Sequence, residues 1–197
     1  MDNMEESLIS LNSTNITDNI LNSPKTNNSN ETIKCNRENS ISESNLKIIS
    51  SIASNLEDII HDNYNIYKNL ILNTDNFSSI YLPCISIEDY LKRIFYYCKI
   101  NISTLILAIV YIDNFCELNG YILTLNNIYR IIMASCLLSI KFNEDICYGN
   151  SFYAKVGSYS VELLNNLEYE FYIKINFNLL VKESYYEKYF NYFSRNC

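Results

Sequence analysis

Apolar residues recur at helical spacing from about residue 45 onward, and residues 124–145 are apolar on nearly every face. Ile128, Ile131 and Leu138 follow one face of this stretch, while Met133 and Leu137 lie on another. A helix that is apolar all round must be surrounded by other helices, and this one is shorter than the roughly 20 apolar residues that span a bilayer. We therefore predict that 124–145 is the central helix of a helical domain, and that its charged C-terminal end carries the function.

The segments on either side carry amphipathic patterns and helix-boundary signals. Pro83 prevents a helix from running through it, Ser86 starts a capping box with Asp89, and Gly120 can end a helix in the left-handed conformation. No segment has a clear strand pattern. We predict an all-α fold with a five-helix core and one flanking helix at each end. The other predicted helices cover 45–61, 87–98, 103–119 (capped by Ser103 or Thr104), 151–156, 160–175 and 182–193.

Residues 1–44 are rich in Asn, Ser and Thr and contain little apolar mass. Ordering them would cost conformational entropy that no burial offsets, so we predict a disordered N-terminal tail. This tail is either inert or a regulatory or targeting segment. Because it lacks the apolar core of a signal peptide, we expect the protein to be intracellular, in the cytoplasm, the nucleus or both.

The composition removes most enzymatic and nucleic-acid-binding classes. A net charge of −7 and the absence of a Lys/Arg cluster argue against nucleic-acid binding. The seven cysteines are scattered without a CxxC pair, which indicates reduced thiols rather than disulfides or a metal site. Three glycines are too few for a phosphate-binding loop, and the single histidine, His61, has no nucleophile beside it in the sequence. We predict a protein that is not an enzyme and has no cofactor, metal, membrane or small-molecule substrate.

Five segments, in order, resemble the cyclin box, and specifically that of the P/U-type cyclins related to the yeast phosphate-pathway cyclin. Each string alone is weak, but five at the family's spacing make a specific match over about residues 77–181. The segments are 77–94 (P-x-I-S-I-x-x-Y-L-x-R-I), 107–113 (L-A-L-x-Y-I-D), 125–130 (L-x-x-x-N-x-H-R), 141–145 (K-F-x-x-D) and 152–171 (Y-A-K-V-G-G … L-N-x-L-E-x-x-F).

This resemblance implies a cyclin-box fold and a non-catalytic regulatory subunit that binds and activates a cyclin-dependent protein kinase as a heterodimer. The alternative is a cyclin-box adaptor or transcription-related binding module that does not activate a kinase. The implied domains are a tail (1–44), an N-terminal helix with its connector (45–76), a single cyclin box (77–181) and a C-terminal helix (182–197).

In cyclins, a Lys ending the third box helix and a Glu in the fifth contact the kinase, and the matching residues here are Lys141 and Glu168. The structural alternative is that Lys141 only complements its helix dipole and that Glu168 is an ordinary surface residue. Phe152, Tyr153 and Lys155 face either a partner or the core. The full predicted kinase-binding set is Lys141, Glu168, Leu138, Phe142, Glu144, Asp145, Leu164, Phe171, Phe152, Tyr153 and Lys155.

The chain departs from the family pattern at several positions. The Arg that two-box cyclins carry early in the first helix would fall near Cys84, whereas Arg93 lies further along. Ser158 stands where the family usually has a second Gly, and Asn114 replaces a common Arg. We expect Asp113, within an apolar segment, to be buried and to pair with a cation or with capping donors.

Overall fold

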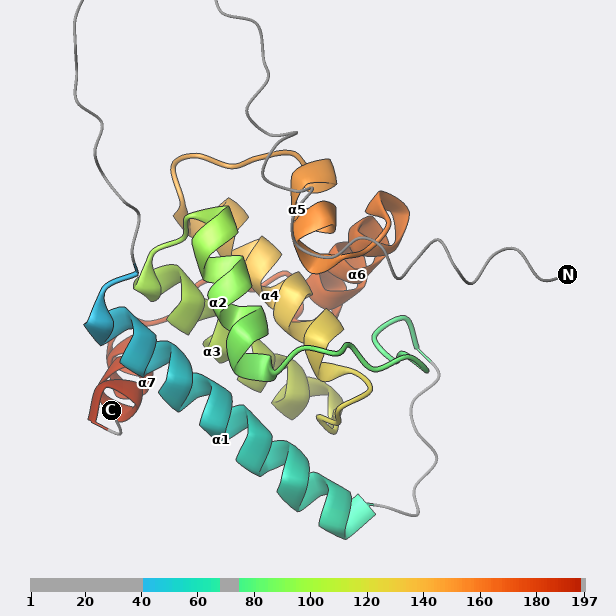
Figure 1. Ribbon diagram of the computed structural model, residues 1–197, viewed down its shortest axis with the longest axis horizontal. Helices are drawn as coiled ribbons and strands as arrows, with labels where there is room; N and C mark the ends of the chain where they lie inside the picture. Colours follow the sequence, from blue (N-terminus) through green and yellow to red (C-terminus); the bar gives the residue numbers. More distant parts are fainter. Residues whose placement is uncertain (1–40, 68–74, 196–197) are drawn as a thin grey trace, which may run out of the picture. The chain divides into compact units, whose positions relative to one another are not determined.

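The computed structural model describes residues 41–67 and 75–195, and that part of the chain consists of seven α-helices without a β-strand (Figure 1). The all-α prediction is therefore confirmed, while the predicted disordered tail lies almost entirely outside the described residues. The helices are α1 (Glu43–Tyr67), α2 (Ile87–Cys98), α3 (Ile102–Asn119), α4 (Ile128–Asn143), α5 (Asn150–Gly157), α6 (Val161–Lys174) and α7 (Glu183–Arg195).

The central helix is α4, whose residues 131–140 are all buried. It packs against α2, α3 and α6 (Figure 1). Its two buried hydroxyls are satisfied within the helix, because Ser135 Oγ donates to Ile132 O at 3.0 Å and Ser139 Oγ donates to Cys136 O at 2.9 Å. The all-round apolar pattern thus reflects a helix enclosed by its neighbours.

The helix boundaries follow capping chemistry. Ser86 and Ser160 cap α2 and α6 by accepting from the backbone N–H three residues later, and Gly120 ends α3 at φ 56°, all as predicted. Two starts within the predicted cyclin box differ from the prediction by more than one residue. The central helix begins at Ile128, not at residue 124, because the Asn127 side chain closes a turn by bonding Thr124 N and Ile122 O. Helix α3 begins at Ile102, two or three residues earlier than a cap at Ser103 or Thr104 implies.

The N-terminal helix α1 is part of the core rather than an accessory to it. It runs to Tyr67, beyond the predicted end near His61, and fully buries Ile49 and Ile52. It packs against α2 and α7 (Figure 1). The last helix, α7, buries only Phe193 completely and otherwise covers α1 and α3 with its aromatic side chains.

An aromatic cluster ties the connector before α2 to α3 and α6. Phe115 and Phe171 stack with centroids 4.6 Å apart, and Phe77 meets both edge-on at 5.2 and 6.2 Å. All three side chains are fully buried. Such aromatic pairs contribute beyond their buried area, so this cluster fixes α6 relative to α3.

The apolar helix α3 is the one described helix whose length and composition would also suit a membrane span. Its contacts with α4, α6 and α7 account for that composition, because these helices cover its apolar faces. Ile106, Val110 and Tyr111 are completely buried.

Candidate functional site

The two residues singled out in the sequence meet at one end of the helix bundle. Lys141 lies in the last turn of α4, and its Nζ is 2.6 Å from Glu168 Oε1 and 2.8 Å from Oε2 on α6. The Lys141 side chain is 36% exposed and the Glu168 side chain 17%. The ion pair is therefore preformed, half-shielded from solvent and reachable from outside.

The Glu168 carboxylate is held from a third helix as well. Asn150, the first residue of α5, donates through Nδ2 to Glu168 Oε2 at 2.8 Å and to Asn165 Oδ1 at 2.7 Å. The end of α4, the start of α5 and one face of α6 therefore meet at one cluster of charged and polar side chains. We name Lys141, Glu168, Asn150 and Asn165 the polar cluster.

Apolar side chains are exposed on the segment that follows Lys141. Phe142 is 49% exposed, Ile146 77% and Tyr148 41%. The Tyr148 ring lies 4.5 Å from the half-buried Phe152 ring, centroid to centroid. Exposed apolar side chains beside polar groups are typical of a protein-binding surface. We name Lys141, Phe142, Ile146, Tyr148, Phe152 and Glu168 the docking face.

Four of the predicted partner contacts lie in the protein's own core, which corrects their proposed role. Leu164, Phe171 and Tyr153 are completely buried, and Leu138 is 5% exposed. Tyr153 also uses its hydroxyl internally, accepting from Tyr148 N at 3.0 Å. These side chains support the docking face from beneath, because a partner cannot touch them without repacking the core.

Glu144 has a structural role that its sequence position did not indicate. Its carboxylate accepts from Asn101 N and Asn101 Nδ2, each at 2.9 Å, and from Thr104 Oγ1 at 2.5 Å. It therefore caps the N-terminus of α3 from the end of α4. Asp145 and Lys155 are exposed and remain available to a partner.

Two of the departures from the family pattern, Arg93 and Ser158, contact each other in the structure. Ser158 adopts the left-handed conformation, φ 61°, a conformation in which glycine has no steric cost. Arg93 reaches from α2 to donate to Ser158 Oγ at 3.2 Å and Lys155 O at 3.5 Å. Arg93 thus closes the end of α5 instead of pairing with an Asp on the next helix.

Asp113 is exposed, contrary to the prediction, and it accepts a hydrogen bond from Tyr189 on α7. Burial and this hydrogen bond raise the Tyr189 pKa well above its usual value.

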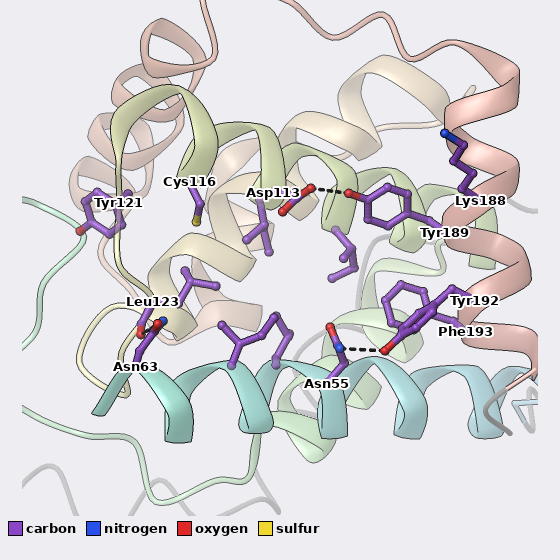
Figure 2. Close-up of a pocket in the computed structure, with 14 residues that line it drawn as sticks. Asn55, Asn63, Asp113, Cys116, Tyr121, Leu123, Lys188, Tyr189, Tyr192 and Phe193 are labelled. Atoms are coloured by element: carbon purple, nitrogen blue, oxygen red, sulfur yellow. Dashed lines mark hydrogen bonds between the residues drawn. The ribbon is translucent and has the colours of Figure 1, made fainter. Parts of the chain in front are cut away.

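A cavity of about 450 Å³ lies between α1, α3 and α7 (Figure 2). The Asp113–Tyr189 hydrogen bond lies on one side of it, and the Asn55–Tyr192 hydrogen bond, 3.2 Å long, lies on the other. The walls between them are mainly apolar. The cavity lies between other helices than those that form the docking face.

Burial suppresses the reactivity of two of the thiols. Burial raises the pKa of the Cys98 and Cys116 thiols to about 12, which leaves almost no reactive thiolate at neutral pH. His61 is exposed on α1, with Nδ1 3.7 Å from Asp62 Oδ1. Within residues 41–67 and 75–195, no three His, Cys, Asp or Glu side chains are placed to hold a metal ion.

Sequence reasoning missed four residues of this region, namely Ile146, Tyr148, Asn150 and Asn165. Asn165 precedes Glu168 by three residues, so both lie on one helix face, and Asn165 could have been predicted from this spacing. The Asn150 contact depends on how α5 folds back onto α6, which no local pattern encodes.

The family model for cyclins matches residues 10–179. The chain is 42% identical to Cyclin-U2-1 of Arabidopsis thaliana over 109 residues, which are 55% of this chain and 49% of the relative. It is 34% identical to Cyclin-P4-1 of Oryza sativa subsp. japonica over 114 residues (57% and 54%) and 34% identical to PHO85 cyclin-7 of Saccharomyces cerevisiae over 122 residues (56% and 43%). The chain thus spans about half the length of the curated relatives it matches.

Proposed function

The chain belongs to the cyclin family, and we propose that it is a non-catalytic regulatory subunit that binds and activates a cyclin-dependent protein kinase through the docking face. The name of the yeast relative couples it to PHO85, and we propose a kinase of that class as the partner. The proposed heterodimer forms in the cytoplasm, the nucleus or both.

The observation that carries this proposal is the unused hydrogen-bonding capacity of the Lys141–Glu168 pair. A lysine ammonium has three donors, and Glu168 is its acceptor in the described part of the chain. Glu168 Oε1 accepts only from Lys141 there, so it retains a lone pair. The pair can therefore donate to a backbone carbonyl and accept from a backbone N–H of a docked segment.

The C-terminal end of a helix offers such carbonyls, because its last four have no intrahelical partner, and the residues that follow the helix can offer the N–H. The exposed Phe142, Ile146 and Tyr148 provide the apolar contact that excludes water around the polar centre. A docked helix would thus be held by both kinds of contact. In a kinase, holding the αC helix inward allows its Glu to pair with the catalytic Lys, as the active state requires.

A binding protein activates a kinase only if it has a higher affinity for the active state than for the inactive state. The chain itself needs no catalytic group for this role.

The test is phosphoryl transfer by a recombinant PHO85-type kinase with and without the chain, for the wild type, Lys141→Ala and Glu168→Ala. We expect activation by the wild type and a loss of about 10-fold or more in affinity for either variant, as for a central interface residue. The matched control is Lys92→Ala, which breaks another partly exposed ion pair, Lys92–Glu88 at 2.8 Å on α2. If both docking-face variants activate as the wild type does, this surface is not the kinase contact. Binding without activation would favour an adaptor.

A further inference from the structure

We propose that Asn150 is a positioning residue that fixes the Glu168 carboxylate in its kinase-binding orientation before the kinase arrives. The inference rests on the proposed function, because it assigns a task to Glu168, but the contact itself is a property of the isolated chain. Asn150 does not belong to the docking face, and it acts through Glu168.

The hydrogen bonds leave Asn150 little freedom. An asparagine amide nitrogen has two donors, and both are directed at α6, toward Asn165 Oδ1 at 2.7 Å and Glu168 Oε2 at 2.8 Å. An ionised carboxylate only accepts hydrogen bonds. The nitrogen of Asn150, not its oxygen, must therefore face Glu168, so the carboxylate determines the orientation of the amide.

The same contacts restrict Glu168. Lys141 approaches both carboxylate oxygens from α4, and Asn150 approaches Oε2 from α5. With only Lys141, two long flexible side chains would hold each other, and the pair could move as a unit. Asn150 ties the pair to the start of a helix through Oε2, and Oε1 keeps a free lone pair within the described residues.

Removing this tie should weaken kinase binding because Glu168 would have to be ordered during association. The loss expected for one unordered long side chain is about 2- to 10-fold in affinity. Asn150→Ala should therefore weaken binding by that factor, while activation at saturating chain stays at the wild-type level. A residue that only stabilised α5 would change the unfolding midpoint instead.

Asn150→Asp separates the two roles most sharply. At the first position of a helix, Asp is at least as favourable as Asn, since it complements the positive end of the dipole. An Asn150 whose only role was to begin α5 would thus tolerate Asp without loss. As a positioning residue it would not, because two carboxylates in contact repel, and Glu168 would turn away. The other charged group facing them is Lys141 from α4; Asn165 on α6 is neutral.

We therefore expect Asn150→Asp to bind the PHO85-type kinase about 10-fold or more weakly than the wild type at pH 8. The control is Asn166→Asp, which adds the same charge at an exposed position of α6. If Asn150→Asp binds as the wild type does at pH 8, the positioning role is wrong.

A double-mutant cycle in the isolated chain tests the contact without the kinase. Asn150→Asp should lower the unfolding midpoint with Glu168 present and have a smaller effect beside Glu168→Gln, whose amide can donate to Asp. Equal effects in both backgrounds would contradict the contact. Should the wild-type chain fail to bind the kinase, the proposed function fails, and this cycle still decides whether Asn150 fixes Glu168.

Discussion

Replacing Glu144 by Ala separates a folding role from a binding role within one short acidic segment. Glu144 and Asp145 are neighbours that end the K-F-x-x-D string, and both were predicted to contact the kinase. Of the two, Glu144 is engaged within the described residues, through three hydrogen bonds to Asn101 and Thr104 at the start of α3. Glu144→Ala removes all three, while Asp145→Ala removes an exposed carboxylate.

The magnitude follows from what each bond does. The N-cap residue of α3, Asn101, makes no side-chain capping bond of its own, so Glu144 supplies that function, worth about 0.5–2 kcal/mol. A carboxylate near the positive helix end adds about 0.3–1 kcal/mol. Thr104 is fully buried, and its hydroxyl would lose its acceptor at a cost of about 1–3 kcal/mol. Because these contributions overlap, we expect about 2–3 kcal/mol in total.

Urea unfolding followed by circular dichroism measures this directly. Glu144→Ala should lower the free energy of unfolding by about 2–3 kcal/mol, equivalent to roughly 4–12 °C in Tm for a chain of this size. Asp145→Ala should stay within about 0.5 kcal/mol of the wild type. Kinase affinity, measured below the unfolding transition, should be unchanged by Glu144→Ala. A destabilisation under 0.5 kcal/mol, or an equal effect of both substitutions, would refute the capping role.

Three further predictions concern the core. Gly157→Ala should lower the free energy of unfolding by about 1–3 kcal/mol, because the added Cβ would lie 2.7 Å from Tyr159 Cδ2 and 3.1 Å from Met133 Sδ. Gly149→Ala should cost far less, because its Cβ would meet only Ser151 Oγ, at 3.9 Å. Equal urea midpoints for the two variants would contradict this. Phe171→Ala should cost about 3–5 kcal/mol by removing a ring of the aromatic cluster, while the half-exposed Phe177→Ala should cost much less in the same assay. Burial raises the Cys98 pKa from 9.0 to about 12, so the stability linked to its protonated thiol is complete below pH 9 and is lost as the pH rises from 9 to 12. Cys98→Ala should therefore flatten the fall in unfolding free energy between pH 8 and 10. An unchanged slope would contradict this prediction.

The features that local chemistry determines were predictable from the sequence. Helical periodicity marked α4 as enclosed, and the Ser86 and Ser160 caps and the Gly120 stop hold in the structure. Each depends on residues within one or two turns of one another. The start of α3 was missed because a distant residue, Glu144, caps that helix, whereas the late start of α4 has a local cause, since Asn127 bonds Thr124 and Ile122.

The candidate site shows the same division. Lys141 and Glu168 were identified through the family strings, and the structure brings them into contact. The sequence could not separate partner-binding apolar residues from core residues. Leu164, Phe171 and Tyr153 have the spacing of a buried face, but spacing does not say whether a partner or the chain's own core covers that face. The contribution of Asn150 depends on the packing of α5 against α6, so it required coordinates.

Hydrogen–deuterium exchange of the chain with and without a PHO85-type kinase tests the central claim most directly, because it locates the contact without any substitution. The account predicts that bound kinase slows exchange at the end of α4, in residues 144–149 and at the start of α5. The account would be contradicted if bound kinase slowed exchange only in α1 and α7, which line the cavity, and left exchange in residues 144–149 unchanged.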